Sequence, residues 1–328
     1  MRVAAPSLTF GEASAHVSRG RADRWIDRGL LALTLLACAV VIVTIAAIIY
    51  KVFDSASLAF STFGLGFLGH VTWNPSGTPA VLGGAAFIYG TIVTSALALF
   101  LAMPIGIAIG LFLSLLAPPR IAAVIGPLVE LLAAIPSVVL GLWGLIFLAP
   151  IMRSSIEPAI HSVLGWIPIF GDPNLVGTGI FTAGLILTIM VVPIIASISR
   201  ELFSSVPPEL KDGALALGVT RWEMVRGVVL GSTGAGLTAT AILGLSRAMG
   251  EAIAVTTVIG NSATIKNLFD NGDTIGSRIA GEVINTTSPL WQSGIFYLAA
   301  ILLVLELIIN LAAQLIVRRY SIASGGVR

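Results

Sequence analysis

The stretch "SVPPELKDGALALGVTRWEMVRGVVLG", residues 205–231, decides the fold. Pro208 suits the first turn of a helix, and Gly218 provides a stop for that helix after about nine residues. Thr220 and Glu223 then form a T-x-x-E capping box, which predicts the start of a second helix. Such an organised segment predicts a docking knob for another protein. The alternative is a surface pair of helices that has no partner.

The composition around this stretch is that of a membrane protein. The chain has 328 residues, of which 56% are hydrophobic and 10% are charged. Soluble domains are about 25% charged, so the deficit places the chain in the membrane class. A net charge of +2 does not indicate nucleic acid as a partner, and the single Cys38 excludes a disulfide within one chain.

Six apolar stretches are long enough to cross a bilayer, which takes about 20 residues in a helix. The sequence therefore predicts an all-α integral membrane protein with a transmembrane domain over 29–320, a cytoplasmic loop over 200–232 and tails over 1–28 and 321–328. Prolines predict kinks in the second and third spans, at Pro104 and Pro136. The predicted spans are 29–50, 87–116, 121–150, 178–199, 233–260 and 294–317.

The distribution of basic residues predicts the orientation of the chain. Of the 18 lysines and arginines, 13 fall on one side of the predicted spans and 4 on the other. Because cytoplasmic loops carry the excess, both termini are expected in the cytoplasm. The segment "RADRWIDR", 21–28, predicts an interfacial helix in the N-terminal tail, and the apolar run after it is too long for a signal peptide.

The fifth predicted span carries a polar stripe. Thr240, Gly244, Arg247 and Glu251 fall on one helix face. A charge near the middle of a bilayer costs about 2.5–3.5 kcal/mol on insertion scales, so Arg247 should face protein or water. Two interpretations follow. The ion pair either locks two helices together, or Arg247 offers positive charge to a passing anion while Glu251 holds its geometry and weakens its grip.

Other polar residues within the spans have a simpler interpretation. Glu130, Glu306 and Asn310 are expected to hydrogen-bond to a neighbouring helix or subunit. The pair Gly106 and Gly110 has the GxxxG spacing of closely packed helices. Three hydroxyl residues of the second span either line a conduit or bond to the helix backbone: Thr91, Thr94 and Ser95.

Neither a catalytic site nor a metal site is indicated. The three histidines are scattered along the chain, at 16, 70 and 161. "GSTGAG", 231–236, is glycine-rich but lacks the lysine and the spacing of a P-loop. The chain is therefore expected to bind no ATP, and the energy for any pumping would come from another subunit. An intramembrane enzyme would need a constellation such as H-E-x-x-H, which does not occur.

The segment 205–231 resembles the EAA loop of bacterial ABC importer permeases. The counterpart of E-A-A is Asp212, Gly213 and Ala214, followed after three residues by Gly218 and after nine more by 228–231. Three positions depart from the pattern. Aspartate replaces glutamate at 212, glycine replaces alanine at 213, and glycine replaces proline at 231. The resemblance implies an ATPase-coupling loop that comprises Glu209, Lys211, Asp212, Gly213, Ala214 and Gly218.

The resemblance extends over most of the chain from residue 29. The stretches "WNPSGTPAVLGGAAFIYGT", "ELLAAIPSVVLG", "LSRAMGEAIAV" and "SPLWQSGIFYLAAILLVLELIINL" resemble the PstC-type permease subunit of the bacterial phosphate ABC importer. This implies the MetI-like six-helix fold, a multi-pass location in the cytoplasmic (inner) membrane and a substrate pathway with Arg247, Glu251 and Thr240. It also implies a PstA-type second permease, two PstB-type ATPases carrying ATP and magnesium, and an external PstS-type phosphate-binding protein.

Two alternatives remain at this stage. The same kind of machine could carry another oxyanion, such as sulfate or molybdate, and uptake of labelled anions would separate these cargoes. A self-sufficient secondary transporter or channel would need neither an ATPase nor an ordered docking loop. Co-purification of the chain with an ATPase would exclude that second class.

Overall fold

The structure is a computed structural model that describes residues 21–323, with side chains over 28–315. Within these ranges the chain is helical, and its single β contact is the isolated bridge between Asn74 and Val81. The all-α prediction is confirmed. Most of the predicted N-terminal tail, residues 1–20, and the end of the predicted C-terminal tail, residues 324–328, lie outside the described residues.

The chain divides into two units, residues 1–51 and residues 52–328. In the first unit, the long helix α1 (Arg21–Phe63) begins within the segment predicted as an interfacial helix, and every side chain over 28–51 is exposed. In the second unit, α1 ends at Phe63 and a 3₁₀ segment, η1 (Gly64–Leu68), follows it. The first predicted span, 29–50, therefore belongs to a helix that extends well beyond residue 50.

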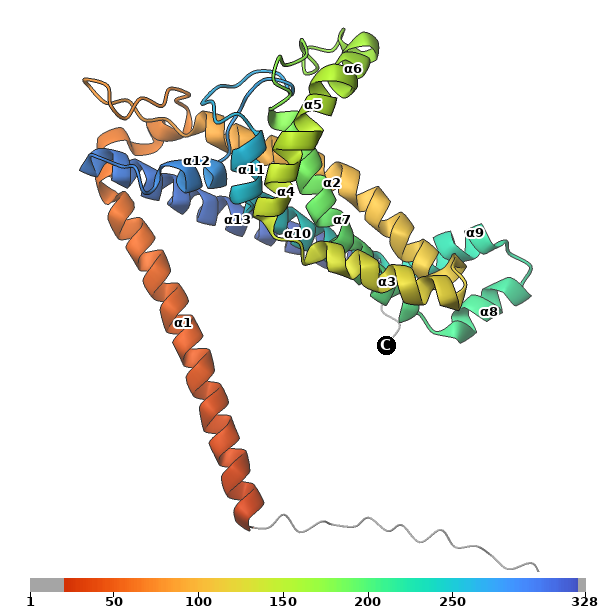
Figure 1. The fold of residues 1–328 in the computed structure, drawn as a ribbon. Coiled ribbons are helices and arrows are strands. Elements are labelled where there is room, and N and C mark those ends of the chain that lie inside the picture. Colours follow the sequence, from red (N-terminus) through yellow and green to blue (C-terminus); the bar gives the residue numbers. More distant parts are fainter. Residues whose placement is uncertain (1–20, 324–328) are drawn as a thin grey trace, which may run out of the picture. The chain divides into compact units, whose positions relative to one another are not determined.

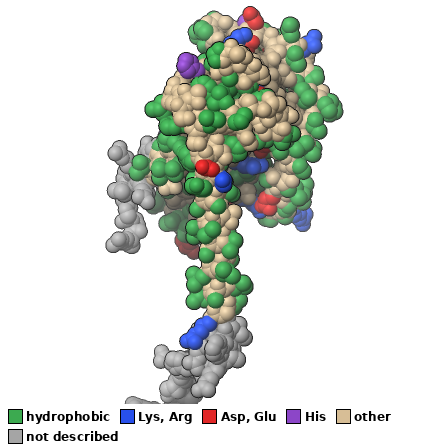
Figure 2. Space-filling model, turned by 90° about the vertical axis from the view of Figure 1, so that its left-hand side faces the viewer, with side chains coloured by type: hydrophobic (Ala, Val, Ile, Leu, Met, Phe, Trp, Pro, Cys, Tyr) green, Lys and Arg blue, Asp and Glu red, His purple; other side chains and the backbone are tan. Residues whose placement is uncertain are grey.

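Within the described residues, six helical runs are long and apolar enough to cross a membrane. This confirms the predicted number of spans, although several bounds differ. Hydrophobic side chains also dominate the face drawn in Figure 2, where charged side chains are few. The candidate spans are Arg28–Leu68, Ala85–Leu116, Ser137–Leu164, Ile180–Ser204, Arg221–Met249 and Pro289–Leu315.

The core of the second unit lies where α2 (Ala85–Leu111) packs along α7 (Ile180–Ser204), as Figure 1 shows. Gly106 and Gly110 permit this close approach, because a Cβ on either glycine would press on α7, at Ile195 or at Ser199. Close packing at the GxxxG pair is therefore confirmed. α2 continues past Pro104 as one helix and ends in a π-helical segment, η2 (Phe112–Leu116).

The third predicted span, 121–150, is wrong. The chain instead forms α3 (Pro119–Ala133), leaves the helix, and starts again at α4 (Ser137–Trp143). Pro136 explains the break, since proline lacks an N–H and disfavours a helical conformation in the residue before it. The run that is long enough to cross a membrane continues through η3 (Gly144–Leu148), α5 (Ala149–Ile151), η4 (Met152–Ile156) and α6 (Glu157–Leu164).

The fifth predicted span, 233–260, is displaced toward the N-terminus. A continuous helical run begins at α9 (Arg221–Met224), passes through a π-helical segment, η5 (Val225–Val229), and ends with α10 (Leu230–Met249). The capping box at Thr220 starts this run early, and Gly250 ends it. Residues 253–258 form a separate short helix, α11 (Ile253–Val258). Accordingly, no bend follows α9 at Gly231, the position where the EAA pattern has proline.

The segment between α11 and the last span is folded back onto the helices. It contains α12 (Ile275–Glu282), which contacts α11, α2 and α13 (Pro289–Ala323). Gly90 of α2 lies against the backbone carbonyl of Asp273, so no side chain would fit at position 90. A segment that reads as an outer loop in the sequence is therefore part of the packed unit.

Candidate functional site

The predicted docking knob has the expected local structure. α8 (Pro208–Ala216) begins after Pro207, and the chain turns at Gly218, whose φ of +84° lies in the left-handed region that favours glycine. The Thr220 hydroxyl accepts the N–H of Glu223, and the Glu223 carboxylate accepts the N–H of Thr220 at 2.8 Å. The capping box and the glycine turn are both confirmed.

The tip of the knob exposes apolar side chains. Leu217 is 87% exposed and Trp222 is 65% exposed, while Asp212 and Gly213 on α8 are also at the surface. Beneath the tip, Lys211 donates to the backbone carbonyl of Phe203 at 3.4 Å. The base of the knob packs around a buried hydrophobic cluster: Phe203, Val206, Met224, Val225 and Val229. The knob therefore presents an apolar tip on a packed base.

Arg247 and Glu251 are brought together, although not within one helix. Arg247 lies in the last turn of α10, where a cation is favoured by the helix dipole. Glu251 lies after Gly250, and its Oε1 accepts the N–H of Ala254 at 3.3 Å. The Arg247 Nη2 and the Glu251 Oε2 are 3.6 Å apart, with the arginine side chain 50% exposed and the glutamate 5% exposed. A buried carboxylate thus faces a half-exposed guanidinium.

The rest of the predicted polar stripe, Thr240 and Gly244, is buried. Thr240 is buried, and its hydroxyl donates to the backbone carbonyl of Gly236 at 2.9 Å. Gly244 is buried against Val191 and Ile195 of α7. The Thr240 hydroxyl is therefore already used within the helix.

Two of the other intramembrane polar residues have partners on neighbouring helices. The Glu130 Oε1 of α3 lies 3.4 Å from the Arg200 Nη1 of α7. Ser246 of α10 donates to the Asn310 Oδ1 of α13 at 2.9 Å. Both contacts confirm that these groups join helices.

The hydroxyl residues of α2 also have a structural role. Thr91, Thr94 and Ser95 are buried and donate to backbone carbonyls of the preceding turn. The Thr91 oxygen also accepts the N–H of Ile275 at 3.0 Å, which holds the start of α12 against α2. These hydroxyls satisfy the backbone and do not line a conduit in this structure.

A charged cluster on α12 was not recognised from the sequence. Asp273, Arg278 and Glu282 read there as charges of an outer loop, but the structure buries Asp273 and leaves Arg278 only 12% exposed. Arg278 forms ion pairs with both carboxylates and lies over the Phe87 ring, 4.9 Å from its centroid. The spacing of four residues between Arg278 and Glu282 was the available signal, since it brings side chains together on a helix.

Two tryptophans complete this cluster. The indole N–H groups of Trp73 and Trp291 both donate to the Glu282 Oε2, at 3.0 and 2.9 Å. A polar cavity of about 180 Å³ lies beside Asp273, Arg278 and Glu282. Burial raises the pKa of Asp273 above its ordinary value, and the charge of Arg278 opposes that rise. The cluster ties the α1–α2 loop, α12 and α13 together.

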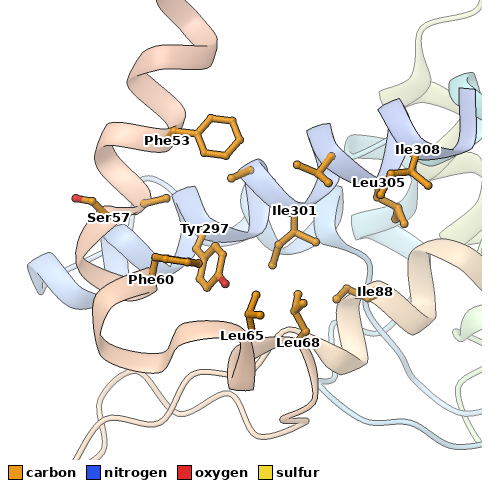
Figure 3. A pocket seen from close by; sticks show the side chains of 13 residues that line it. Phe53, Ser57, Phe60, Leu65, Leu68, Ile88, Tyr297, Ile301, Leu305 and Ile308 are labelled. Carbon is orange, nitrogen blue, oxygen red and sulfur yellow. The ribbon is translucent and has the colours of Figure 1, made fainter. Parts of the chain in front are cut away.

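A second cavity, of about 710 Å³, has a different character (Figure 3). It is lined by apolar side chains that include Phe53, Phe60 and Ile301, and the Tyr297 hydroxyl on its wall donates to the Gly64 carbonyl at 3.0 Å. Neither Arg247 nor Glu251 lines it. An apolar cavity of this kind suits hydrocarbon and does not suit a hydrated anion.

The fold and the site together define a multi-pass membrane permease with an ordered docking loop. Residues 103–322 match the family model of the binding-protein-dependent transport system inner membrane component. The chain belongs to this family, whose members are the permease subunits of ABC importers.

Curated relatives agree with this family. The chain is 39% identical over 299 residues to the phosphate transport system permease protein PstC of Mesorhizobium japonicum, covering 90% of each chain. It is 37% identical to the protein of the same name from Haemophilus influenzae, covering 92% of this chain and 96% of the relative. The predicted kinship with PstC-type permeases is confirmed.

Solved structures show the same fold. A bacterial ABC transporter that imports the acidic polysaccharide alginate matches with a TM-score of 0.61 and 16% identity, covering 92% of this chain and 99% of the other. The MetNI methionine ABC transporter, in an inward-facing conformation, matches with a TM-score of 0.52 and 19% identity, covering 72% and 96%. At these identities the likeness concerns the fold alone, and it confirms the MetI-like arrangement.

Proposed function

We propose that this chain is the permease subunit of an ATP-driven importer that moves inorganic phosphate across the inner membrane. The observation that carries the proposal is the half-exposed Arg247 within a membrane span, paired loosely with a buried Glu251. The names of the PstC relatives, which are similar over most of the chain, support phosphate as the cargo.

The environment of Arg247 fits a transient anion site. A guanidinium exposed within a span must face protein or water, because lipid would leave its charge unsolvated. A separation of 3.6 Å from Glu251 is longer than the 2.7–2.9 Å of a tight charge-assisted hydrogen bond, so donors remain for an oxyanion. The planar fork of arginine matches two oxygens of such an anion. The neighbouring Glu251 carboxylate lowers the affinity of Arg247 for the anion, and a transported anion must be bound weakly enough to be released.

The docking knob supplies the link to the energy source. We assign the coupling role to α8 and to the exposed residues that follow it, Leu217, Gly218 and Trp222. ATP and magnesium would be held by the partner ATPase and not by this chain. A PstB-type ATPase dimer, a PstA-type permease and a PstS-type receptor are the expected partners, with the knob and both termini on the cytoplasmic side.

Uptake by the Arg247→Gln variant tests the proposal. We expect the variant to assemble normally and to lose most uptake of labelled phosphate, because it lacks the positive charge that would bind the anion. Arg153→Gln is the matched control, since Arg153 is exposed and far along the chain from the site. Undiminished phosphate uptake by an assembled Arg247→Gln complex would overturn the proposed role. Uptake of labelled sulfate and molybdate by the unmodified complex decides the cargo.

A further inference from the structure

Glu306 is a carboxylate for which the packing of the chain provides no partner. It lies on α13 within the candidate span Pro289–Leu315 and is partly buried. Among the side chains over 28–315, none forms a hydrogen bond or an ion pair with it, whereas Glu130, Glu157 and Glu251 all have such contacts. An ionisable residue at this depth is costly and is usually matched by a partner or by water.

The position of Glu306 is set by a specific contact between α10 and α13. Ser246 donates to Asn310 at 2.9 Å, which fixes the two helices against each other. About one turn after Ser246 and one turn before Asn310, Glu306 lies beside Gly250. A Cβ at Gly250 would lie 3.4 Å from the Glu306 Oε1. The absence of a side chain at Gly250 leaves the carboxylate open on that side. Glu306 therefore lies beside the break that separates Arg247 from Glu251.

Arg247 lies close along the chain to Gly250, the residue that faces Glu306. Arg247 lies in the last turn of α10 and Gly250 caps that helix, and residues three apart are neighbours on one helix face, about 5–6 Å apart. The Arg247 side chain is half exposed, and its guanidinium lies 3.6 Å from the Glu251 carboxylate, which is not a tight hydrogen bond. Transfer of the guanidinium from Glu251 to Glu306 would proceed by rotation about the side-chain bonds of Arg247.

We propose that Glu306 is a positioning residue of the anion site, a second carboxylate that accepts the Arg247 guanidinium in exchange with Glu251. This deepens the proposed function and rests on it. The arginine alternates between two carboxylates, and the passing anion competes with both for its donors. Release follows when the guanidinium returns to a carboxylate, which keeps the anion from being held too tightly.

The maximal uptake rate of the reconstituted complex, at saturating receptor and phosphate, tests this role. Glu306→Gln removes the second acceptor and is expected to slow uptake about 3- to 10-fold, in the range of coupled neighbouring residues. Glu306→Asp keeps the charge and is expected to recover most of the rate. Glu130→Gln is the matched control, because Glu130 is paired with Arg200 on other helices, and its uptake rate should stay near that of the unmodified complex.

A double-mutant cycle with Arg247→Lys identifies the route of the effect. If Glu306 acts through the arginine, the double variant departs about threefold or more from the product of the two single effects. Independent effects, or equal uptake by Glu306→Gln and the unmodified complex, would overturn the inference. Equal melting temperatures of Glu306→Gln and Glu306→Asp, together with different uptake rates, exclude a merely structural role. Normal uptake by Arg247→Gln is a separate outcome, which overturns the proposed anion-binding role of Arg247 on which this inference rests.

Discussion

Gly90 of α2 lies directly beneath the backbone carbonyl of Asp273, and a Cβ at that position would overlap the carbonyl oxygen. Through this contact, the segment before α12 packs against the helical core. The segment carries the ion-pair cluster of Arg278 and begins a few residues beyond the Arg247–Glu251 pair. The contact therefore connects the packing of α2 with the region around the proposed anion site.

The first prediction concerns the contact between Gly90 and the Asp273 carbonyl. Gly90→Ala is expected to destabilise the protein by about 1–3 kcal/mol, the range of overpacking in a well-packed core. The melting temperature of the purified complex measures the effect. Gly231→Ala is the control, since a Cβ there meets nothing within 4 Å and alanine favours a helix. Equal melting temperatures for the two variants would show that the segment moves aside freely.

The second prediction concerns the buried cluster on α12. Arg278→Met leaves the Asp273 carboxylate buried without its cation, and breaking such a pair costs about 3–5 kcal/mol. Trp291→Phe removes one hydrogen bond to Glu282 and should cost about 1 kcal/mol. Lys266→Met is the control, because this lysine side chain is exposed and surface changes usually stay within about 0.5 kcal/mol. Chemical unfolding of the purified complex ranks the three variants, and the opposite ranking would contradict the cluster's structural role.

The third prediction follows from the raised pKa of Asp273. Between the ordinary pKa of an aspartate, about 3.9, and the higher folded value, the folded state holds a proton that the unfolded state has lost. The contribution of this group to stability therefore falls as the pH rises through that window. Melting curves measured from about pH 4 to pH 7 should show this slope, and Asp273→Asn should flatten it. A slope that is unchanged in Asp273→Asn would assign the pH dependence to other groups.

The fourth prediction concerns the turn of the docking knob. Gly218→Val places a β-branched residue at a φ of +84°, which only glycine adopts readily. We expect the variant to reach the membrane in normal amounts but to retain less ATPase on purification. Gly227→Ala is the control, because its φ is ordinary and a Cβ there meets nothing within 4 Å. Full retention of the ATPase by Gly218→Val would place the docking contact elsewhere.

Local signals predicted the local structure well. Proline at 208, glycine at 218 and the Thr220 capping box mark helix ends through short-range chemistry, and the structure has all three where expected. The number of spans follows from hydropathy for the same reason. The span limits at Pro136 and Gly250 were predicted less well. The sequence predicted a kink within a span at Pro136, where the structure has a break between two helices, and apolar residues resume after Glu251, which extended the fifth predicted span too far.

The residues that depend on distant packing could not be predicted. Nothing near Arg278 in the sequence shows that Phe87, Trp73 and Trp291 surround its cluster, since these residues come from other elements. The burial of Thr240 could not be read from the sequence either, because it depends on how the helices pack. Glu306 reads as one more intramembrane carboxylate until the contact of α13 with α10 brings it to Gly250.

The segments α9, η5 and α10 form one uninterrupted helical run. From Arg221 to Met249 the helix is continuous through its π-helical segment and is about 42 Å long at 1.5 Å per residue. The apolar tip near Trp222 is at one end, and Arg247 is at the other. Under the proposed function, this one helical run would link the ATPase-docking surface to the anion site, and a displacement of the tip would be passed along it to Arg247.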